Sequence, residues 1–346
     1  MISLILFTFT VNLSAQASDR FSVEDWKQSF AAAVSKNNVQ KLNQLTDLQK
    51  IETQAVPKCV DCEIKNKIRQ ARELFSKSDY AGAEKLYNQI PKGSDVWLEA
   101  VEERGWSHFR RENFEKTLAQ TKTLLSPQFV GGVGTEAYLL QSLAQLRICN
   151  YEGILTTHQM FKEKHKTRII EIQNLSNTGV NNALKQVVQK ASKFPLKYED
   201  FGELVTKLPL LFYRDLEVQK QLLNLKISQA ALTVLADTSS SVYKVKFNHL
   251  KSDSSAKLQK RIQVLATEEN AASAKIVQKL NLIEVEAIQR IHTDMALKDD
   301  SYKLSKFKKT NDDQLIFMDD GQPWIDELDK YDVAAKSCVK GIRRKM

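Results

Sequence analysis

The sequence has few of the residues that interrupt regular structure. Its 346 residues include only 11 glycines and 6 prolines. A β-sandwich or a doubly wound α/β domain of this length usually needs more of them, because glycine and proline supply the backbone angles of tight turns. The scarcity therefore favours long helices and an all-α fold.

Motifs for catalysis or ligand binding are also lacking. The five histidines form no H-E-x-x-H pattern, and there is no nucleophile elbow or kinase signature. The glycine-rich run at 130–134 has neither a preceding strand nor a following Lys-Ser/Thr, so it is interpreted as a loop between helices. His158 and His165 are spaced to share a helix face, but solvated side chains are the preferred interpretation. The sequence predicts no enzyme, with no catalytic residue, metal or cofactor.

No dense block of one charge dominates the chain. The 51 basic residues are interleaved with 42 acidic ones, which leaves a formal net charge of +9. This pattern is typical of solvated helix faces, so nucleic acid is not the expected partner. Charge-driven binding to an anionic polymer stays an alternative.

An apolar run lies at the N-terminus. Residues 4–13 are apolar or nearly so, which is far short of the roughly 20 residues that span a membrane. The sequence Ser14-Ala15-Gln16-Ala17 follows and has the form of a cleavage site. No lysine or arginine precedes the run, which departs from the usual signal. We predict a signal peptide over 1–17 and export to the periplasm or cell envelope, against the alternative of a buried N-terminal helix.

Cysteine is rare, and its number is even. Two disulfides are consistent with an oxidising compartment, although four cysteines allow three pairings. Proximity along the chain favours one bridge between neighbours and a second that tethers the C-terminal segment. The favoured pairs are Cys59–Cys62 and Cys149–Cys338.

What the sequence does contain is helical periodicity. In the predicted N-terminal helices (18–63), Ser22 is placed to cap a helix that buries Trp26 and Phe30, and a second helix is expected over 39–54. Residues 64–166 then repeat a polar-aromatic pair between amphipathic stretches, at intervals of 34 and 37 residues. The pairs are Asp79-Tyr80, Asn113-Phe114 and Asn150-Tyr151.

This repeat resembles the tetratricopeptide repeat, a helical hairpin with a period of about 34 residues. The first unit fits best, with small residues at Ala71 and Ala83 and an aromatic at Tyr87. Later units keep Gly105 and Ser142 in the first helix. They depart from the pattern in the second helix, at Thr117, Thr121, Ile154 and His158.

The resemblance implies a groove, lined by the first helix of each hairpin, that binds a segment of a partner protein. Aromatic and arginine side chains there suit an extended peptide with apolar anchors and acidic groups. Packing against a neighbouring hairpin is the competing interpretation of the aromatic residues. The groove residues implied by the family register are Arg72, Phe75, Trp106, Phe109, Arg110, Leu143 and Arg147, with Ile68, Glu102 and Leu139 beside them.

Residues 167–300 predict two or three long helices that fold back as an antiparallel coiled coil or bundle. The serine clusters 238–241 and 252–255 are expected breaks, and the apolar stripe is interrupted by Glu269. The stripe is expected to pack within the chain, with a dimer seam as the alternative. Its members are Leu258, Ile262, Leu265, Ala272, Ile276, Leu280, Ile283, Ala287 and Ile291.

The C-terminal segment, 301–346, is expected to dock on the helical body through Trp324, Leu328 and Tyr331. Together with the repeats and the coiled coil, this ending resembles exported repeat proteins of gliding and predatory Gram-negative bacteria. The sequence therefore predicts a non-catalytic envelope scaffold with a protein partner. The alternative is a structural coiled-coil element of an envelope assembly, with a possible homodimer through the coiled coil.

Overall fold

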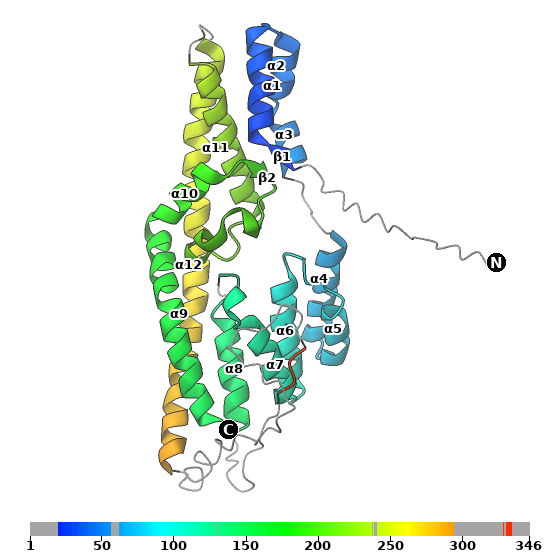
Figure 1. Cartoon of the computed structure of the whole chain (residues 1–346), viewed down its shortest axis with the longest axis vertical. Coiled ribbons are helices and arrows are strands. Elements are labelled where there is room, and N and C mark those ends of the chain that lie inside the picture. The colour runs from blue at the N-terminus through cyan, green and yellow to red at the C-terminus, as the bar shows by residue number, and fades with distance from the viewer. Residues whose placement is uncertain are drawn as a thin grey trace, which may run out of the picture.

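The computed structural model describes residues 20–56, 62–129, 131–236, 238, 241–293, 328 and 330–333. This part of the chain is all-α, apart from a two-residue antiparallel pairing of β1 (Phe21–Ser22) with β2 (Lys193–Phe194). The predicted fold class is confirmed: successive helices pack in pairs and the described fold ends in one long helix (Figure 1).

Three short helices open the described chain: α1 (Val23–Ser35), α2 (Val39–Leu45) and α3 (Leu48–Ala55). The predicted start of α1 is confirmed, because the Ser22 hydroxyl accepts a hydrogen bond from the Asp25 N–H at 3.2 Å. The single helix expected over 39–54 is instead two. The reason is local: Asp47 caps a new helix by accepting from the Lys50 N–H at 3.4 Å.

The next six helices form three hairpins: α4 (Cys62–Ser76) with α5 (Tyr80–Tyr87), α6 (Trp97–Arg110) with α7 (Phe114–Leu124), and α8 (Glu136–Arg147) with α9 (Tyr151–Thr178). Each polar-aromatic pair found in the sequence sits at the turn of one hairpin. The polar residue caps the second helix, accepting an N–H at 2.9–3.1 Å from the residue three positions on. The residue before it has positive φ in all three turns, at Ser78, Glu112 and Cys149.

A fourth turn of the same kind joins α1 to α2, outside the repeat seen in the sequence. Asn37 has a φ of 49°, and Asn38 caps α2 by accepting the Lys41 N–H at 2.9 Å. In all four turns the cap residue's N–H also bonds to the carbonyl five positions earlier. This bond satisfies a carbonyl that the helix end would otherwise leave unpaired.

The small and aromatic positions of the repeat form the contacts between hairpin helices. A methyl group added at Gly105 would lie 2.9 Å from Leu140 Cδ2 and 3.3 Å from Gln120 Cβ, so α6, α7 and α8 approach closely there. The positions that depart from the family pattern are buried like the others. All have an exposed fraction of at most 2%: Ala71, Ala83, Tyr87, Thr117, Thr121, Ser142, Ile154 and His158.

After α9 the chain forms α10 (Asn182–Lys190), two 3-10 segments (Tyr198–Asp200 and Gly202–Lys207), α11 (Leu216–Val234) and α12 (Ser241–Thr293). The 53-residue α12 packs along α11 and then along α9 (Figure 1). Its contacts with α9 run antiparallel, since Gln259 bonds to the Thr178 carbonyl and Lys162 pairs with Glu284. At the end of α9, Gly179 has positive φ and lies against the backbone of α12.

The apolar stripe on α12 packs within the chain, as preferred from the sequence. Most of its residues are buried against α8, α9 and α11, but Ala272 is exposed. One expected break is found, between α11 and α12. The break expected at 252–255 is wrong, because α12 continues through it with Ser254 fully buried. Tertiary packing there outweighs the weak helix propensity of serine.

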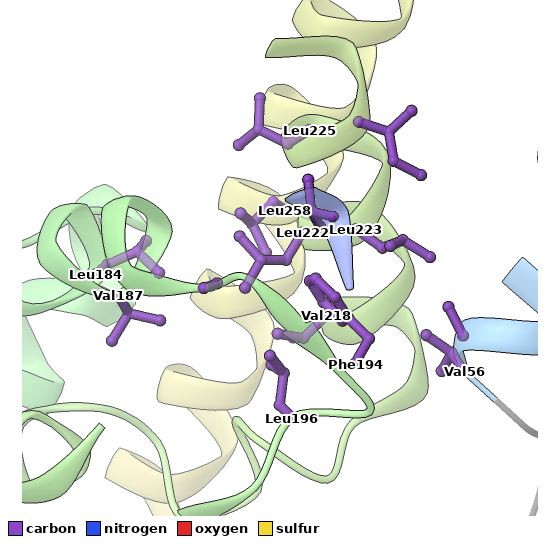
Figure 2. Close-up of a cluster of buried hydrophobic side chains, with 14 of the residues drawn as sticks. Val56, Leu184, Val187, Phe194, Leu196, Val218, Leu222, Leu223, Leu225 and Leu258 are labelled. Atoms are coloured by element: carbon purple, nitrogen blue, oxygen red, sulfur yellow. The ribbon is translucent and has the colours of Figure 1, made fainter. Parts of the chain in front are cut away.

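Two hydrophobic cores each include part of α9 and part of α12. The first, the array core, lies among the three hairpins α4–α9, which we call the array, and the last turns of α12. The N-terminal core joins α1–α3 to the end of α9, α10, α11 and the first half of α12. Figure 2 shows part of this second core, where Phe194, Leu196 and Val218 gather beside Leu222 and Leu258. The helix α9 continues across the boundary expected between residues 166 and 167, so it contributes to both cores.

A short piece of the C-terminal segment lies on the array. Leu328 is 4% exposed, and its carbonyl accepts a hydrogen bond from Lys92 Nζ at 2.6 Å. Lys122 Nζ lies 4.5 Å from the centre of the Tyr331 ring. Trp324 and Cys338 lie outside the described residues.

The described cysteines stand at the ends of array helices. Cys62 begins α4, Cys149 lies in the turn before α9, and neither is a free thiol. Cys59 and Cys338 fall outside the described residues, as does the expected signal peptide, so the pairing and the leader stay predictions. Among the described helices, none combines the length and apolarity needed to cross a bilayer.

Candidate binding surface on the hairpin array

The groove residues expected from the sequence lie on the first helices of the three hairpins, α4, α6 and α8. Arg72, Trp106 and Leu143 occupy equivalent positions, 34 and 37 residues apart like the turns themselves. We refer to the seven residues below as the groove surface. It comprises Arg72 and Phe75 on α4, Trp106, Phe109 and Arg110 on α6, and Leu143 and Arg147 on α8.

Burial separates this surface from the positions that only hold the hairpins together. Phe75, Trp106, Phe109 and Leu143 are partly exposed, whereas the signature positions of the repeat are buried. Two flanking residues belong to the array core instead: Ile68 and Leu139 are each 4% exposed.

The aromatic residues of the groove surface contact one another edge to face. Phe109 lies 5.7 Å from Trp106 and 5.6 Å from Phe114, measured between ring centres. In the first hairpin, Phe75 makes the equivalent contact with Tyr80 at 5.1 Å. Each phenylalanine therefore packs on the turn of its own hairpin and is partly exposed.

The three arginines differ in their surroundings. The Arg72 guanidinium donates to Glu103 at 2.6–3.0 Å and to Glu99 at 2.9 Å, and these carboxylates raise its pKa. Arg110 is exposed and has no hydrogen bond or ion pair with another described residue. Arg147 is also exposed. Arg110 is therefore the cation of the groove surface best placed to meet an acidic group.

The interpretation of His158 and His165 as solvated is wrong, and His108 is buried as well. His108, His158 and His165 are 2–3% exposed, because each lies on the inner face of an array helix. Burial is the main cause that lowers the pKa of all three, to about 4 for His108 and His165. His165 lies between Tyr138 and Phe161, with ring centres 4.9 and 5.6 Å away. Across the described ranges, no group of side chains has the arrangement of a metal site.

The sequence did not predict a cavity of about 370 Å³ where the two cores meet. It is bordered by α6, α8, α9, α12 and the segment before α11. The loop that contains Gly132 and Gly134 forms one wall, and Glu269, the charge that interrupts the α12 stripe, lies on another. A charge within an apolar stripe and a glycine run were the available signals, but only the fold shows that they face one space.

Glu269 binds groups from two other elements at this junction. Its carboxylate pairs with Arg168 of α9 at 2.5 Å and accepts the Leu210 N–H at 2.7 Å. Arg168 also donates to the Thr206 carbonyl at 2.6 Å. The charge is therefore part of a network that fixes α12 to α9 between the two cores.

No family model matches the chain, and no curated protein or solved structure matches it either. The class of the molecule consequently comes from its own geometry. It is an all-helical protein in which successive helices pack in pairs. Three of these pairs are regular hairpins, and one long helix packs along much of the fold.

Proposed function

We propose that this chain is a non-catalytic scaffold that binds a partner protein on the groove surface of a tetratricopeptide-like array. The supporting observation is that Trp106 and Phe109 remain partly exposed next to Arg110, which has no partner among the described residues, although the small and aromatic signature positions between the hairpin helices are buried. Clustered aromatic and arginine side chains are the groups that contribute most at protein interfaces.

The chemistry of the surface suggests the kind of segment that binds. The rings of Phe75, Trp106 and Phe109 offer apolar contact area along successive hairpins, and Arg110 offers a planar pair of donors for a carboxylate. The partner we propose is an extended peptide segment with apolar anchors and an acidic group. From the N-terminal sequence, we place this function in the periplasm or cell envelope.

The test is selection of binding peptides from a random library on the full chain, followed by affinity measurement with the variant Trp106→Ala/Arg110→Ala. Because the indole and the guanidinium would carry much of the binding energy, we expect selected peptides to be apolar and acidic. We also expect the double variant to lose at least tenfold in affinity, which corresponds to about 1.4 kcal/mol.

A matched control changes one exposed charge elsewhere on the array. Lys116→Ala on α7 should leave peptide affinity unaltered, since Lys116 lies outside the groove surface. Circular dichroism and thermal melting should be the same for all variants. Early melting of Trp106→Ala/Arg110→Ala would assign these residues to the core, and full retention of binding would remove the groove surface from consideration.

A second candidate function, a structural element that self-associates through α12, is favoured by a separate observation. Near the end of α12, Leu282, Val285 and Ile288 are 71%, 53% and 41% exposed and recur every three residues. Such a stripe is suited to a helix from a second copy. The variant Leu282→Glu/Val285→Glu tests it by light scattering: a dimer that dissociates supports this function, and a wild-type monomer at all concentrations excludes it.

A further inference from the structure

The cavity between the two cores has mostly apolar walls and an excess of acidic groups. Its volume of about 370 Å³ is within the range of small-ligand sites. Leu98, Ile169 and Leu265 contribute apolar surface from three different helices. Of these helices, α9 and α12 contribute to both cores and α6 to the array core, so the walls are held by the fold itself.

The charged groups around the cavity are not balanced. Two ion pairs account for both of its arginines: Arg214 with Glu99, and Arg168 with Glu269. Three more carboxylates line it without a hydrogen bond or ion pair to any described residue. They are Glu102 on α6, Glu136 on α8 and Glu268 on α12.

Glu102 is the most enclosed of these carboxylates. Burial, followed by the nearby charges of Glu136, Glu103 and Glu99, raises its pKa to about 8. Its surroundings therefore favour the neutral acid, although an isolated carboxyl ionises well below pH 7. A bound cation would reverse this preference, because it would offset both the burial and the repulsion.

We propose that this cavity binds a primary ammonium group carried on an apolar chain, with Glu102 and Glu136 receiving the ammonium and the apolar walls receiving the chain. Two sources share this chemistry: a free alkylamine and a lysine side chain of another polypeptide. The net charge of +9 repels cations from the protein as a whole, whereas the local excess of carboxylates attracts them to this cavity. This proposal does not depend on the groove surface.

The experiment is titration calorimetry of the full chain with hexylammonium, and with hexanol as the uncharged probe. Hexylammonium should bind and hexanol should bind at least tenfold more weakly. Binding should release close to one proton at pH 7, seen by comparing buffers of different ionisation enthalpy, because Glu102 ionises as the ammonium enters. For the same reason, affinity should rise several-fold between pH 6.5 and 8.

The variant Glu102→Gln keeps the shape of the side chain and removes its charge. It should reduce hexylammonium affinity at least tenfold and abolish proton release, while Glu112→Gln, exposed and outside the cavity, should change neither. Melting of Glu102→Gln should not decrease, since the variant removes a repelled group. A short lysine peptide with blocked termini separates the sources: its binding with the same proton release indicates a lysine side chain, and its failure indicates the free amine.

Two results would overturn the proposal. One is the absence of hexylammonium binding at millimolar concentration by wild type with normal helicity. The other is binding that hexanol matches or that Glu102→Gln leaves unchanged, because the carboxylate would then have no part in recognition.

Discussion

The array and the N-terminal core differ in how far along the chain their contacts reach. In the array, α6 approaches α7 and α8 closely at Gly105, and the helices α4 to α8 pack mainly on helices close to them in sequence. In the N-terminal core, Phe30 packs on Phe247 at 5.7 Å between ring centres, and Lys246 donates to a carbonyl 200 residues earlier. A repeated local unit leaves a periodic trace in the sequence, whereas a core assembled from distant segments leaves none.

The two regions are nevertheless joined, because α9 and α12 run through both. A fragment covering 64–166 would end within α9 and would expose the apolar face that α12 covers. Point substitutions are therefore a sharper way than truncation to test what each region contributes.

The largest expected effect is at the junction. Glu269→Leu leaves the Arg168 guanidinium buried without its partner, and such a broken pair typically costs about 3–5 kcal/mol. Denaturant unfolding measures the loss. The double variant Arg168→Met/Glu269→Leu should recover much of it, since no charge is then left unpaired. Equal losses in the single and double variants would show that the pair does not couple the two regions.

Nearly as large an effect is expected in the N-terminal core. Phe30 is fully buried and stacks on Trp26 with ring centres 5.0 Å apart, so Phe30→Ala should cost about 3–5 kcal/mol. Val242→Ala, at a site 75% exposed on α12, is the control and should stay within about 0.5 kcal/mol. A small loss in Phe30→Ala would mean that the first helices dock only loosely on α11 and α12.

The response to acid should distinguish the regions, because the buried histidines belong to the array. The pKa of His165 is about 4 in the folded state, below the unfolded value of about 6.5. The unfolded chain therefore binds the proton more strongly, and this contribution to stability is complete above pH 6.5 and lost as the pH falls toward 4. Lowering the pH from 7 to 5 should cost roughly 1–2 kcal/mol through His165.

Measurement of this effect requires a matched variant. The raised pKa of Glu102 acts in the opposite direction. The contribution of Glu102 to the free energy of unfolding falls as the pH rises from the pKa of this group in the unfolded chain toward 8. The change in unfolding free energy between pH 7 and 5 should therefore be compared between wild type and His165→Phe, which keeps the ring and removes the titration. Identical pH slopes in the two proteins would contradict a buried neutral His165.

The smallest predicted effect concerns the close approach of array helices. Gly105→Ala places a methyl group 2.9 Å from Leu140, which outweighs the gain in helix propensity, so we expect a net loss of about 1–2 kcal/mol. The control is Gly93→Ala, where nothing lies within 4 Å of the added carbon. Thermal melting should separate the two. An unchanged melting temperature in Gly105→Ala would show that the hairpins can move apart without cost.

Much of the array was predictable, because its signals are local. The capping side chains Asp79, Asn113 and Asn150 mark three turns, and the start of α1 follows from Ser22. The helix start at Val39 was predicted, but the likeness of the turn at Asn38 to the three repeat turns was not, since the helices around it do not carry the repeat's other positions. Of the candidate site, the groove surface was predicted as a set of positions, and its accessibility required the structure.

Other features depended on neighbours that a single segment cannot specify. Ser252–Ser255 is expected as a break from composition, but packing of α12 on α11 keeps it helical. The histidines are polar in isolation, and only the arrangement of helices decides that His165 is enclosed by Tyr138 and Phe161.

The sequence by itself determined the helical class, the hairpin turns and the apolar stripe of α12. These follow from periodicity, capping and the scarcity of glycine and proline, which act over a few residues at a time. Only the tertiary structure decided that α12 joins two cores, that Glu269 pairs with Arg168, and that carboxylates without a partner among the described residues line one cavity. The physical reason is that burial and charge pairing depend on distances between segments, and those distances exist only after the helices have packed.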